Sequence, residues 1–389
     1  MSQVVLPGAT IGVLGGGQLG RMMALAGRQM GYRFVCIAHR EDSSCGQVCD
    51  RQITAPYDDL EAAQELAAVS DVITYEFENI SPAVTVLLES EGLLPQGSKL
   101  LEVTRHRRVE KEAVTAAGAT VVPYANVAGE TTAAGEKSLR KALKKIGTPS
   151  MLKTATGGYD GKGQRAIRRP EEGDEALREL GGFGEFVLET FIDFQRELSV
   201  VVSRSTTGEV ETFPVAENIH VDKILHLSIA PARVSQEIQD RASKLAVDIA
   251  ENLEMVGTLA VELFLKADDE IFVNELAPRP HNSGHYAMDA CWTSQFEQHI
   301  RAVCGLPLGN PRQHTPVVMA NLLGQHVDSW LKECQKKPES VEVKTHLYGK
   351  GDARRNRKMG HVNVLADSVD EALAWIEEVD VWKDRVVES

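Results

Sequence analysis

The stretch from Met151 to Gln164 has the residue types of a phosphate-binding hairpin. It places Lys153 near its start and then Gly157, Gly158, Gly161 and Gly163 around Tyr159, Asp160 and Lys162. Glycine lets a backbone turn with positive φ, and successive N–H groups in such a turn form a concavity that attracts anions. Lysines beside it suit a polyphosphate because an ammonium is a compact charge with three donors. The alternative is a flexible glycine hairpin with solvated lysines.

A second set of residues suits a divalent cation. Two apolar runs, 259–265 and 271–276, each carry a glutamate and flank a polar turn. If Asp268 and Asp269 form a two-residue hairpin loop, Glu262 lies directly opposite Glu275. Like charges in that position destabilise a sheet, so we expect a cation between them, and carboxylates with phosphate oxygens are a typical Mg²⁺ site. A register slip would instead separate the two glutamates.

Two further loops are rich in polar residues. Residues 277–285 contain Arg279, His281, Asn282, Ser283 and His285. A catalytic triad of Ser283 with either histidine is the less favoured interpretation, because no nucleophile-elbow pattern surrounds the serine.

The loop 348–361 carries a basic cluster made of Lys350, Arg354, Arg355, Arg357 and Lys358. In a chain of net charge -14, such a local cluster indicates an anionic ligand. A solvated basic loop is the alternative.

The elements that would position these groups begin at the N-terminus. Residues 10–14 predict a strand, Gly15–Gly20 fits G-x-G-x-x-G, and a helix over 21–30 and a strand over 32–38 follow. The turn presents N–H groups at a helix N-terminus, where a dinucleotide, a mononucleotide phosphate or only tight packing would fit.

The next helix and strand are predicted over 60–69 and 71–77. Glu76 is a site candidate because the strands of open α/β sheets carry ligand groups at their C-terminal ends. Further on, Arg105–Arg108 and Lys111 lie on a predicted helix, and by themselves they indicate a solvated helix face.

Length and composition bound the remaining possibilities. The chain has 389 residues, which favours two or three domains, and 43% hydrophobic with 25% charged residues indicates a folded protein. A net charge of -14 argues against nucleic-acid binding. We expect no membrane segment, because no run reaches ~18 apolar residues. The cysteines at 36, 45, 49, 291, 304 and 334 lack paired metal spacing, so we expect reduced thiols in a cytoplasmic protein.

Five motifs together resemble one known family. They are Gly15–Met22, Tyr75–Asn79, Gly158–Gln164, Asn274–His285 and Arg357–His361, and they span nearly the whole chain in order. In this combination they are similar to the 5-(carboxyamino)imidazole ribonucleotide synthases of the ATP-grasp superfamily. The resemblance implies an α/β and α+β protein with an ATP-grasp fold. It implies an N-terminal Rossmann-like domain over 1–104, an ATP-grasp domain over 105–305 with a lid near 120–190, and a small C-terminal domain over 306–389.

The resemblance also implies a reaction. ATP would phosphorylate bicarbonate to carboxyphosphate, and 5-aminoimidazole ribonucleotide would take up the carboxyl group, with ADP and phosphate as the other products. ATP and Mg²⁺ would be the cofactors, and the family suggests a homodimer. The alternatives are another ATP-grasp ligase, such as a formate-dependent glycinamide ribonucleotide transformylase, or an NAD-dependent oxidoreductase built on the glycine turn.

Carried over residue by residue, the family implies the following sites. ATP would contact Arg107, Lys153, Gly158, Tyr159, Asp160, Gly161, Lys162, Gly163, Gln164, Glu189, Thr190, Phe191, Ile192, Glu197, His220, Asn274 and Glu275. Mg²⁺ would be held by Glu262 and Glu275. The ribonucleotide would contact Gly15, Gly16, Gly17, Gln18, Leu19, Glu76, Tyr159, Asp160, Asn282, Ser283, Lys350 and Arg357. Catalytic roles would fall to Arg279, His281 and Lys153, with the first two near bicarbonate.

Two departures from the family pattern leave choices open. His106 stands where an aspartate is usual, and Arg108 follows Arg107, so either arginine could contact ATP. Arg354 and Arg355 are adjacent, and either could reach a ligand.

Overall fold

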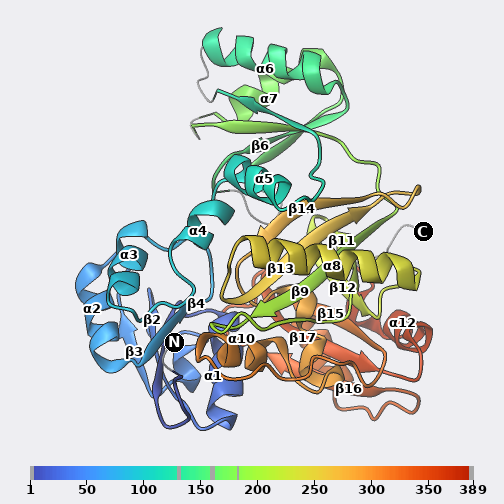
Figure 1. Ribbon diagram of the computed structural model, residues 1–389. Helices are drawn as coiled ribbons and strands as arrows, with labels where there is room; N and C mark the ends of the chain where they lie inside the picture. The colour runs from blue at the N-terminus through green and yellow to red at the C-terminus, as the bar shows by residue number, and fades with distance from the viewer. Residues whose placement is uncertain (1–3, 129–132, 158–162, 182–183, 385–389) are drawn as a thin grey trace. The chain divides into compact units, whose positions relative to one another are not determined.

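The computed structural model describes residues 4–128, 133–157, 163–181 and 184–384. The chain divides into two compact units, one made of residues 1–100, 198–261 and 277–389 and the other of 101–197 and 262–276 (Figure 1). Across the described ranges, none of the helices is both long and apolar enough to span a bilayer.

The chain begins with a parallel sheet of order β3-β2-β1-β4. Its strands are β1 (Thr10–Leu14), β2 (Arg33–Ala38), β3 (Arg51–Thr54) and β4 (Val72–Tyr75), and its helices are α1 (Gln18–Gln29), α2 (Leu60–Val69) and α3 (Pro82–Ser90). The predictions of β1, β2, β4, α1 and α2 are confirmed, whereas the short strand β3 was missed. Parallel strands are buried on both faces, which explains the apolar runs of β1 and β2.

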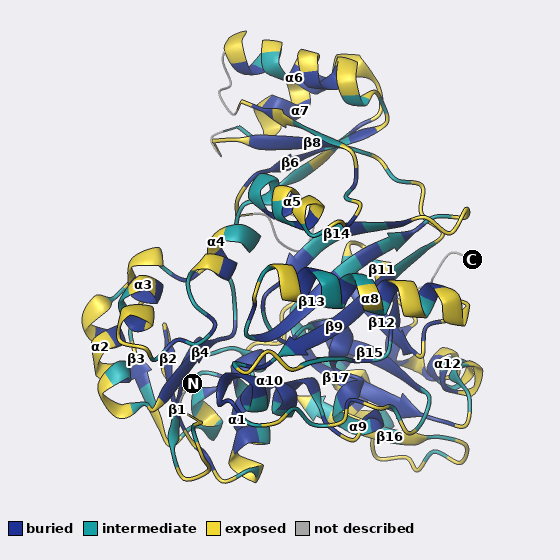
Figure 2. Ribbon diagram, in the orientation of Figure 1, coloured by how far each residue is buried: buried dark blue, intermediate teal, exposed yellow. Residues whose placement is uncertain are grey.

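The second unit contains an antiparallel sheet of order β5-β8-β6-β7. Its strands are β5 (Tyr124–Val127), β6 (Ser150–Thr154), β7 (Gln164–Ile167) and β8 (Phe186–Thr190), and its helices are α4 (Lys99–Thr104), α5 (Arg107–Ala116), α6 (Ala133–Ile146) and α7 (Gly173–Glu179) after the turn η2 (Pro170–Glu172). The buried faces of α6 and α7 cover the sheet, with Leu139, Leu152 and Leu188 in one core (Figure 2). Within this sheet β6 and β8 are paired neighbours, so side chains from both strands can lie on the same face.

The largest sheet has the order β14-β13-β9-β11-β12-β15-β17-β16, and β10 pairs with β9. Its strands are β9 (Arg196–Arg204), β10 (Val210–Thr212), β11 (Ala216–Val221), β12 (Ile224–Ala230), β13 (Gly257–Leu265), β14 (Ile271–Ala277), β15 (Val317–Leu323), β16 (Glu342–Leu347) and β17 (Lys358–Leu365). The helices between them are α8 (Gln236–Asn252), α9 (Ala287–Ala290), α10 (Gln295–Val303), α11 (Val327–Glu333) and α12 (Val369–Glu378), with short turns η3 (Asn282–Gly284), η4 (Gly324–His326) and η5 (Asp380–Trp382).

Helix α8 illustrates how local sequence sets these elements. The Ser235 side chain caps its N-terminus by accepting from the Ile238 N–H, and buried residues recur at helical spacing from Ile238 to Ile249. This stripe belongs to the core, as its periodicity predicts.

Candidate functional site

A buried ion cluster lies where α5, β6 and β8 meet. Glu189 on β8 forms ion pairs with Lys153 on β6, with Oε2 and Nζ 2.7 Å apart, and with Lys111 on α5, with Oε1 and Nζ 3.0 Å apart. The side chains of Lys111 and Glu189 are only 2% and 3% exposed. Burial by itself would raise the pKa of Glu189, but the two ammonium groups lower it to about 2. The carboxylate is therefore ionised and holds both lysines in place.

A second ion pair adjoins this cluster. Arg107, at the start of α5, places Nη1 3.1 Å from Oε2 of Glu275 on β14. Glu110, one helical turn on, is buried and accepts from the Leu276 N–H at 3.3 Å. Burial, followed by the charge of Glu275, raises the pKa of Glu110 to about 8. The unit thus gathers several cations and carboxylates at one edge of α5.

The structure separates the two adjacent arginines. Arg108 points the other way, and its guanidinium bonds both oxygens of Glu112 at 3.0 and 3.1 Å on the surface. His106 lies with Nε2 3.4 Å from Oε2 of Glu185. Arg107, and not Arg108, therefore faces the ion cluster.

The turn between β13 and β14 differs from the prediction. The Lys266 N–H donates to the Glu270 carbonyl at 3.0 Å, and the Asp269 N–H donates to the Lys266 carbonyl at 3.1 Å, with Asp269 at φ 63°. This is a three-residue loop with a bulge, because aspartate tolerates the left-handed conformation. The predicted two-residue loop is wrong. The pairing at this turn sets Lys266 against Glu270, one residue out of the register that would have put Glu262 opposite Glu275, so a metal site at these two glutamates stays a prediction of the family resemblance alone.

The donor set here still suits Mg²⁺. Glu262, Asn274 and Glu275 supply carboxylate and carboxamide oxygens, the hard ligands that this ion prefers. The Asn274 Oδ1 atom is buried and accepts no hydrogen bond from the residues that the structure describes. A buried acceptor without a donor is costly, which is consistent with a ligand contact at this atom.

The glycine-rich stretch forms the predicted hairpin. Lys153 pairs with Gln164 across β6 and β7, and the Thr154 N–H donates to the Gly163 carbonyl at 2.8 Å. Gly157 and Gly163 have φ of 75° and 72°, which only glycine adopts freely. The hairpin tip, with Gly158, Tyr159, Asp160, Gly161 and Lys162, lies outside the described residues.

The segment after β8 carries the residues expected around adenine. The N–H groups of Thr190 and Phe191 donate to the carbonyls of Pro123 and Pro149 at 2.9 and 3.1 Å, so they are engaged within the protein. Phe191 is exposed, while Ile192 and Glu197 are half-buried. His220, on β11 in the other unit, is exposed.

The glycine turn of the first unit is filled by a carboxylate. Glu76, which directly follows β4, accepts from the Gly17 N–H and, at 2.6 Å, from the Gly20 N–H. The Gly16 N–H donates to the Tyr57 hydroxyl at 3.2 Å. A Cβ at Gly15 would collide with the Glu76 side chain, so glycine is required there. The protein itself supplies the anion at the α1 N-terminus, which argues against a dinucleotide pyrophosphate at these groups.

The basic loop after β16 contacts residues 44 and 47 of the segment between β2 and β3. The Ser44 hydroxyl donates to the Tyr348 carbonyl, and Gln47 Nε2 donates to the Gly349 carbonyl at 2.9 Å. Burial raises the pKa of Glu76, and the positive charge of Lys350 opposes that rise. Lys350 therefore lies close to Glu76, whose carboxylate accepts from the Gly20 N–H in the first turn of α1.

The arginines of the basic loop differ in exposure. Arg357 is half-buried and donates from Nη1 to the Asp352 carbonyl at 2.9 Å. The side chains of Arg354 and Arg355 are each 72% exposed. Of these three, Arg357 is the least exposed.

The polar loop after β14 is held from several sides. Arg279 donates from Nε to Oε2 of Glu78 at 2.9 Å. His281 Nδ1 lies 2.9 Å from Oγ of Ser283, and Ser283 also accepts from Ser199 at 2.8 Å. Burial, with the positive charge of Arg279, lowers the pKa of His281 well below its ordinary value, so the ring is neutral.

Asn282 in this loop stands out. It is buried, and both polar atoms of its amide lack a hydrogen-bond partner in the portion of the chain that the structure describes. An amide placed in this way suits contact with a ligand.

Two residues of the ion cluster, Glu110 and Lys111, were missed by sequence reasoning. The sequence did contain a signal for them, because Glu110 and Lys111 stand three and four positions after Arg107 and so share its face of the helix. Which face is buried, however, depends on β8 and β14, which are remote in sequence.

Three family models match successive parts of the chain. The ribonucleotide synthetase pre-ATP-grasp domain family matches residues 8–104, the ATP-grasp domain family 112–296, and the phosphoribosylaminoimidazole carboxylase C-terminal domain family 317–374. The N5-carboxyaminoimidazole ribonucleotide synthase of Bacillus subtilis (strain 168) is 49% identical over 385 residues, which is 98% of each chain.

Solved structures agree with this assignment. A crystal structure of an N5-carboxyaminoimidazole ribonucleotide synthetase in complex with ADP has a TM-score of 0.94 at 49% identity, covering 99% of this chain and 100% of that one. The enzyme from Aspergillus clavatus, in complex with ADP and 5-aminoimidazole ribonucleotide, has a TM-score of 0.86 at 30% identity, covering 95% of this chain and 97% of that one. The chain therefore belongs to the N5-carboxyaminoimidazole ribonucleotide synthase family of ATP-grasp ligases.

Proposed function

We propose that this chain uses ATP and bicarbonate to carboxylate 5-aminoimidazole ribonucleotide in purine biosynthesis, giving N5-carboxyaminoimidazole ribonucleotide, ADP and phosphate. The observation that carries the proposal is the cluster of Lys153, Lys111 and Arg107 around Glu189 and Glu275, in a chain that matches this family from end to end. Such a cluster supplies the positive charge that a triphosphate needs.

In the first step, a bicarbonate oxygen attacks the γ-phosphorus of ATP and ADP leaves, which forms carboxyphosphate. Lys153 and Arg107 neutralise charge on the phosphates, and Glu189 orients Lys153 through their ion pair. Gly163 and Gln164 contact the phosphates, Thr190–Ile192 contact adenine, and Glu197 and His220 contact the nucleotide. This chemistry depends mainly on positioning and charge neutralisation.

Glu262, Asn274 and Glu275 would hold Mg²⁺. When bound, the ion would neutralise charge on the phosphate oxygens. Arg107 lies 3.1 Å from the Glu275 carboxylate and so holds it in place.

In the second step, the exocyclic amine of the ribonucleotide attacks the carboxyl carbon, or the CO₂ that carboxyphosphate releases, and phosphate leaves. Lys350 and Arg357 bind the ribonucleotide phosphate near Gln18 and Leu19, and Asn282 and Ser283 contact its polar groups. Arg279 and His281 hold bicarbonate, and burial, which lowers the pKa of His281 well below its ordinary value, keeps its ring neutral. We further propose a cytoplasmic homodimer, and a lid within residues 120–190.

The test is phosphate release from ATP with the ribonucleotide and bicarbonate added separately and together. The proposal predicts full turnover only with both, and loss of turnover when formate replaces bicarbonate. Equal turnover with formate would assign the chain to a formate-dependent ligase instead. NADH oxidation without ATP turnover would assign it to the oxidoreductases.

A further inference from the structure

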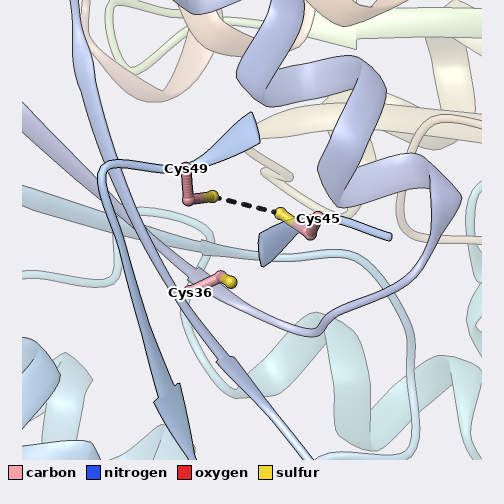
Figure 3. A group of neighbouring side chains, drawn as sticks. All are labelled: Cys36, Cys45 and Cys49. Atoms are coloured by element: carbon pink, nitrogen blue, oxygen red, sulfur yellow. Dashed lines mark hydrogen bonds between the residues drawn. The ribbon is translucent and has the colours of Figure 1, made fainter. Parts of the chain in front are cut away.

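Three thiols of the first unit come together beside the glycine turn. Cys36 lies on β2, and Cys45 and Cys49 flank the short turn η1 (Gly46–Val48) (Figure 3). Their three sulfur atoms lie within 4.8 Å of one another, with the Cys45 and Cys49 sulfurs 3.5 Å apart. All three are free thiols, so the cluster is not held by a disulfide.

These spacings suit metal coordination. A zinc–thiolate bond of about 2.3 Å implies sulfur–sulfur distances of about 4 Å around one cation. The observed separations, 3.5 Å and up to 4.8 Å, bracket that value. Thiolates are soft ligands that select zinc and monovalent copper over magnesium or calcium.

The cluster is built into the fold instead of lying loose on the surface. Cys36 and Cys45 are fully buried, and Cys49 is half-buried. The Cys45 N–H donates to the Gly16 carbonyl at 3.1 Å, and the Cys49 N–H donates to the Gly46 carbonyl at 3.3 Å. These bonds fix the chain between β2 and β3, so the three sulfurs are already oriented toward one point.

We propose that Cys36, Cys45 and Cys49 bind one thiophilic d¹⁰ cation through three thiolates, distinct from the Mg²⁺ ligands of the other unit. The thiol protons pass to solvent as the sulfur–metal bonds form. Within the described ranges, no histidine, carboxylate or further cysteine joins the group. Water, entering beside half-buried Cys49, completes the coordination of zinc, whereas monovalent copper needs only the three sulfurs.

Such a cation would tie the glycine turn to β2. An added Cβ at Gly20 would lie 3.0 Å from the Cys45 sulfur, so the first turn of α1 packs directly on this group. Binding would therefore stiffen the turn that Glu76 caps, and it would raise the melting temperature even without ATP or the ribonucleotide.

The test is a titration of reduced, full-length protein with Cd²⁺ alone under anaerobic conditions, followed by the sulfur-to-cadmium charge-transfer band. A Cys334→Ser background removes the exposed thiol. The proposal predicts saturation at one equivalent, with binding weakened by at least about tenfold in Cys36→Ala and Cys49→Ala. Cys304→Ala is the matched control, because Cys304 is a buried thiol of the same core and should leave binding unchanged.

The outcomes are distinct. Unchanged binding in Cys49→Ala overturns the proposal, as does the absence of a stoichiometric band. Because Cys49 is half-buried, its variant should fold even if Cys36→Ala does not, and the melting temperature of each metal-free variant checks this. Displacement of Cd²⁺ by Zn²⁺ or by monovalent copper identifies the cation, and displacement by neither overturns the proposal.

Discussion

Lys111 and Glu189 form an ion pair with Nζ and Oε1 3.0 Å apart, and almost no part of either side chain is exposed. Removing one member of such a pair leaves a buried charge without its full complement. Lys153, the lysine proposed to bind phosphate, pairs with the other oxygen of Glu189. By holding Glu189 in place, Lys111 therefore also helps to position Lys153.

Lys111→Met should therefore reduce the free energy of unfolding by about 3 kcal/mol. Arg108→Met is the matched control, since its ion pair with Glu112 is on the surface and should contribute little to the free energy of unfolding. Urea denaturation measures both. Equal decreases in the free energy of unfolding of the two variants would show that the buried pair stabilises the fold no more than the surface pair does.

Glu110 should make stability depend on pH. Its pKa is raised from 4.5 to about 8, so between these values the folded state holds a proton that the unfolded state has lost. Stability must then fall as pH rises through this window, by up to about 1.4 kcal/mol per pH unit. Glu110→Gln has no carboxyl group to titrate here, so its free energy of unfolding should rise relative to that of the wild type between pH 5 and pH 8. A constant difference in unfolding free energy across that range would rule out the raised pKa.

Glu275→Gln should lower the rate of phosphate release from ATP by on the order of a hundredfold or more while leaving the fold intact, because a carboxylate proposed to hold Mg²⁺ is lost. Glu270→Gln, in the exposed turn before β14, is the control and should retain activity. Circular dichroism checks the fold. Full turnover in Glu275→Gln would remove Glu275 from the metal site.

Arg357→Ala should raise the KM for the ribonucleotide by at least about tenfold, since a hydrogen bond to a charged group contributes roughly 1.5–3 kcal/mol. The KM for ATP should change little. Arg354→Ala, which removes an exposed side chain of the same loop, should alter neither constant. Parallel increases in both KM values of Arg357→Ala would place Arg357 outside the ribonucleotide site.

Local patterns predicted much of the fold. The bounds of β1 and α2 follow directly from an apolar run and from a capped helix, whose Asp59 side chain accepts from the Glu61 and Ala62 N–H groups. Glu76 was also predicted as a site candidate, because open α/β sheets carry ligand groups at the C-terminal ends of their strands. These features depend on neighbours in sequence.

The features that sequence reasoning missed depend on distant contacts. Lys111 looked like a solvated helix residue, and only β8 makes it buried. The register after Lys266 was misjudged because Asp269 adopts a left-handed conformation that its residue type permits but does not require. The thiol cluster was missed because Cys36 reaches Cys45 and Cys49 only through the pairing of β2 within its sheet.

The most direct test of the account is the fate of oxygen in bicarbonate. With ¹⁸O-labelled bicarbonate, ATP and 5-aminoimidazole ribonucleotide, the released phosphate should carry one bicarbonate oxygen, because that atom attacks the γ-phosphorus. The carboxylated ribonucleotide should appear in equal amount. Unlabelled phosphate, or turnover that does not need bicarbonate, would contradict phosphorylation of bicarbonate by ATP on this chain.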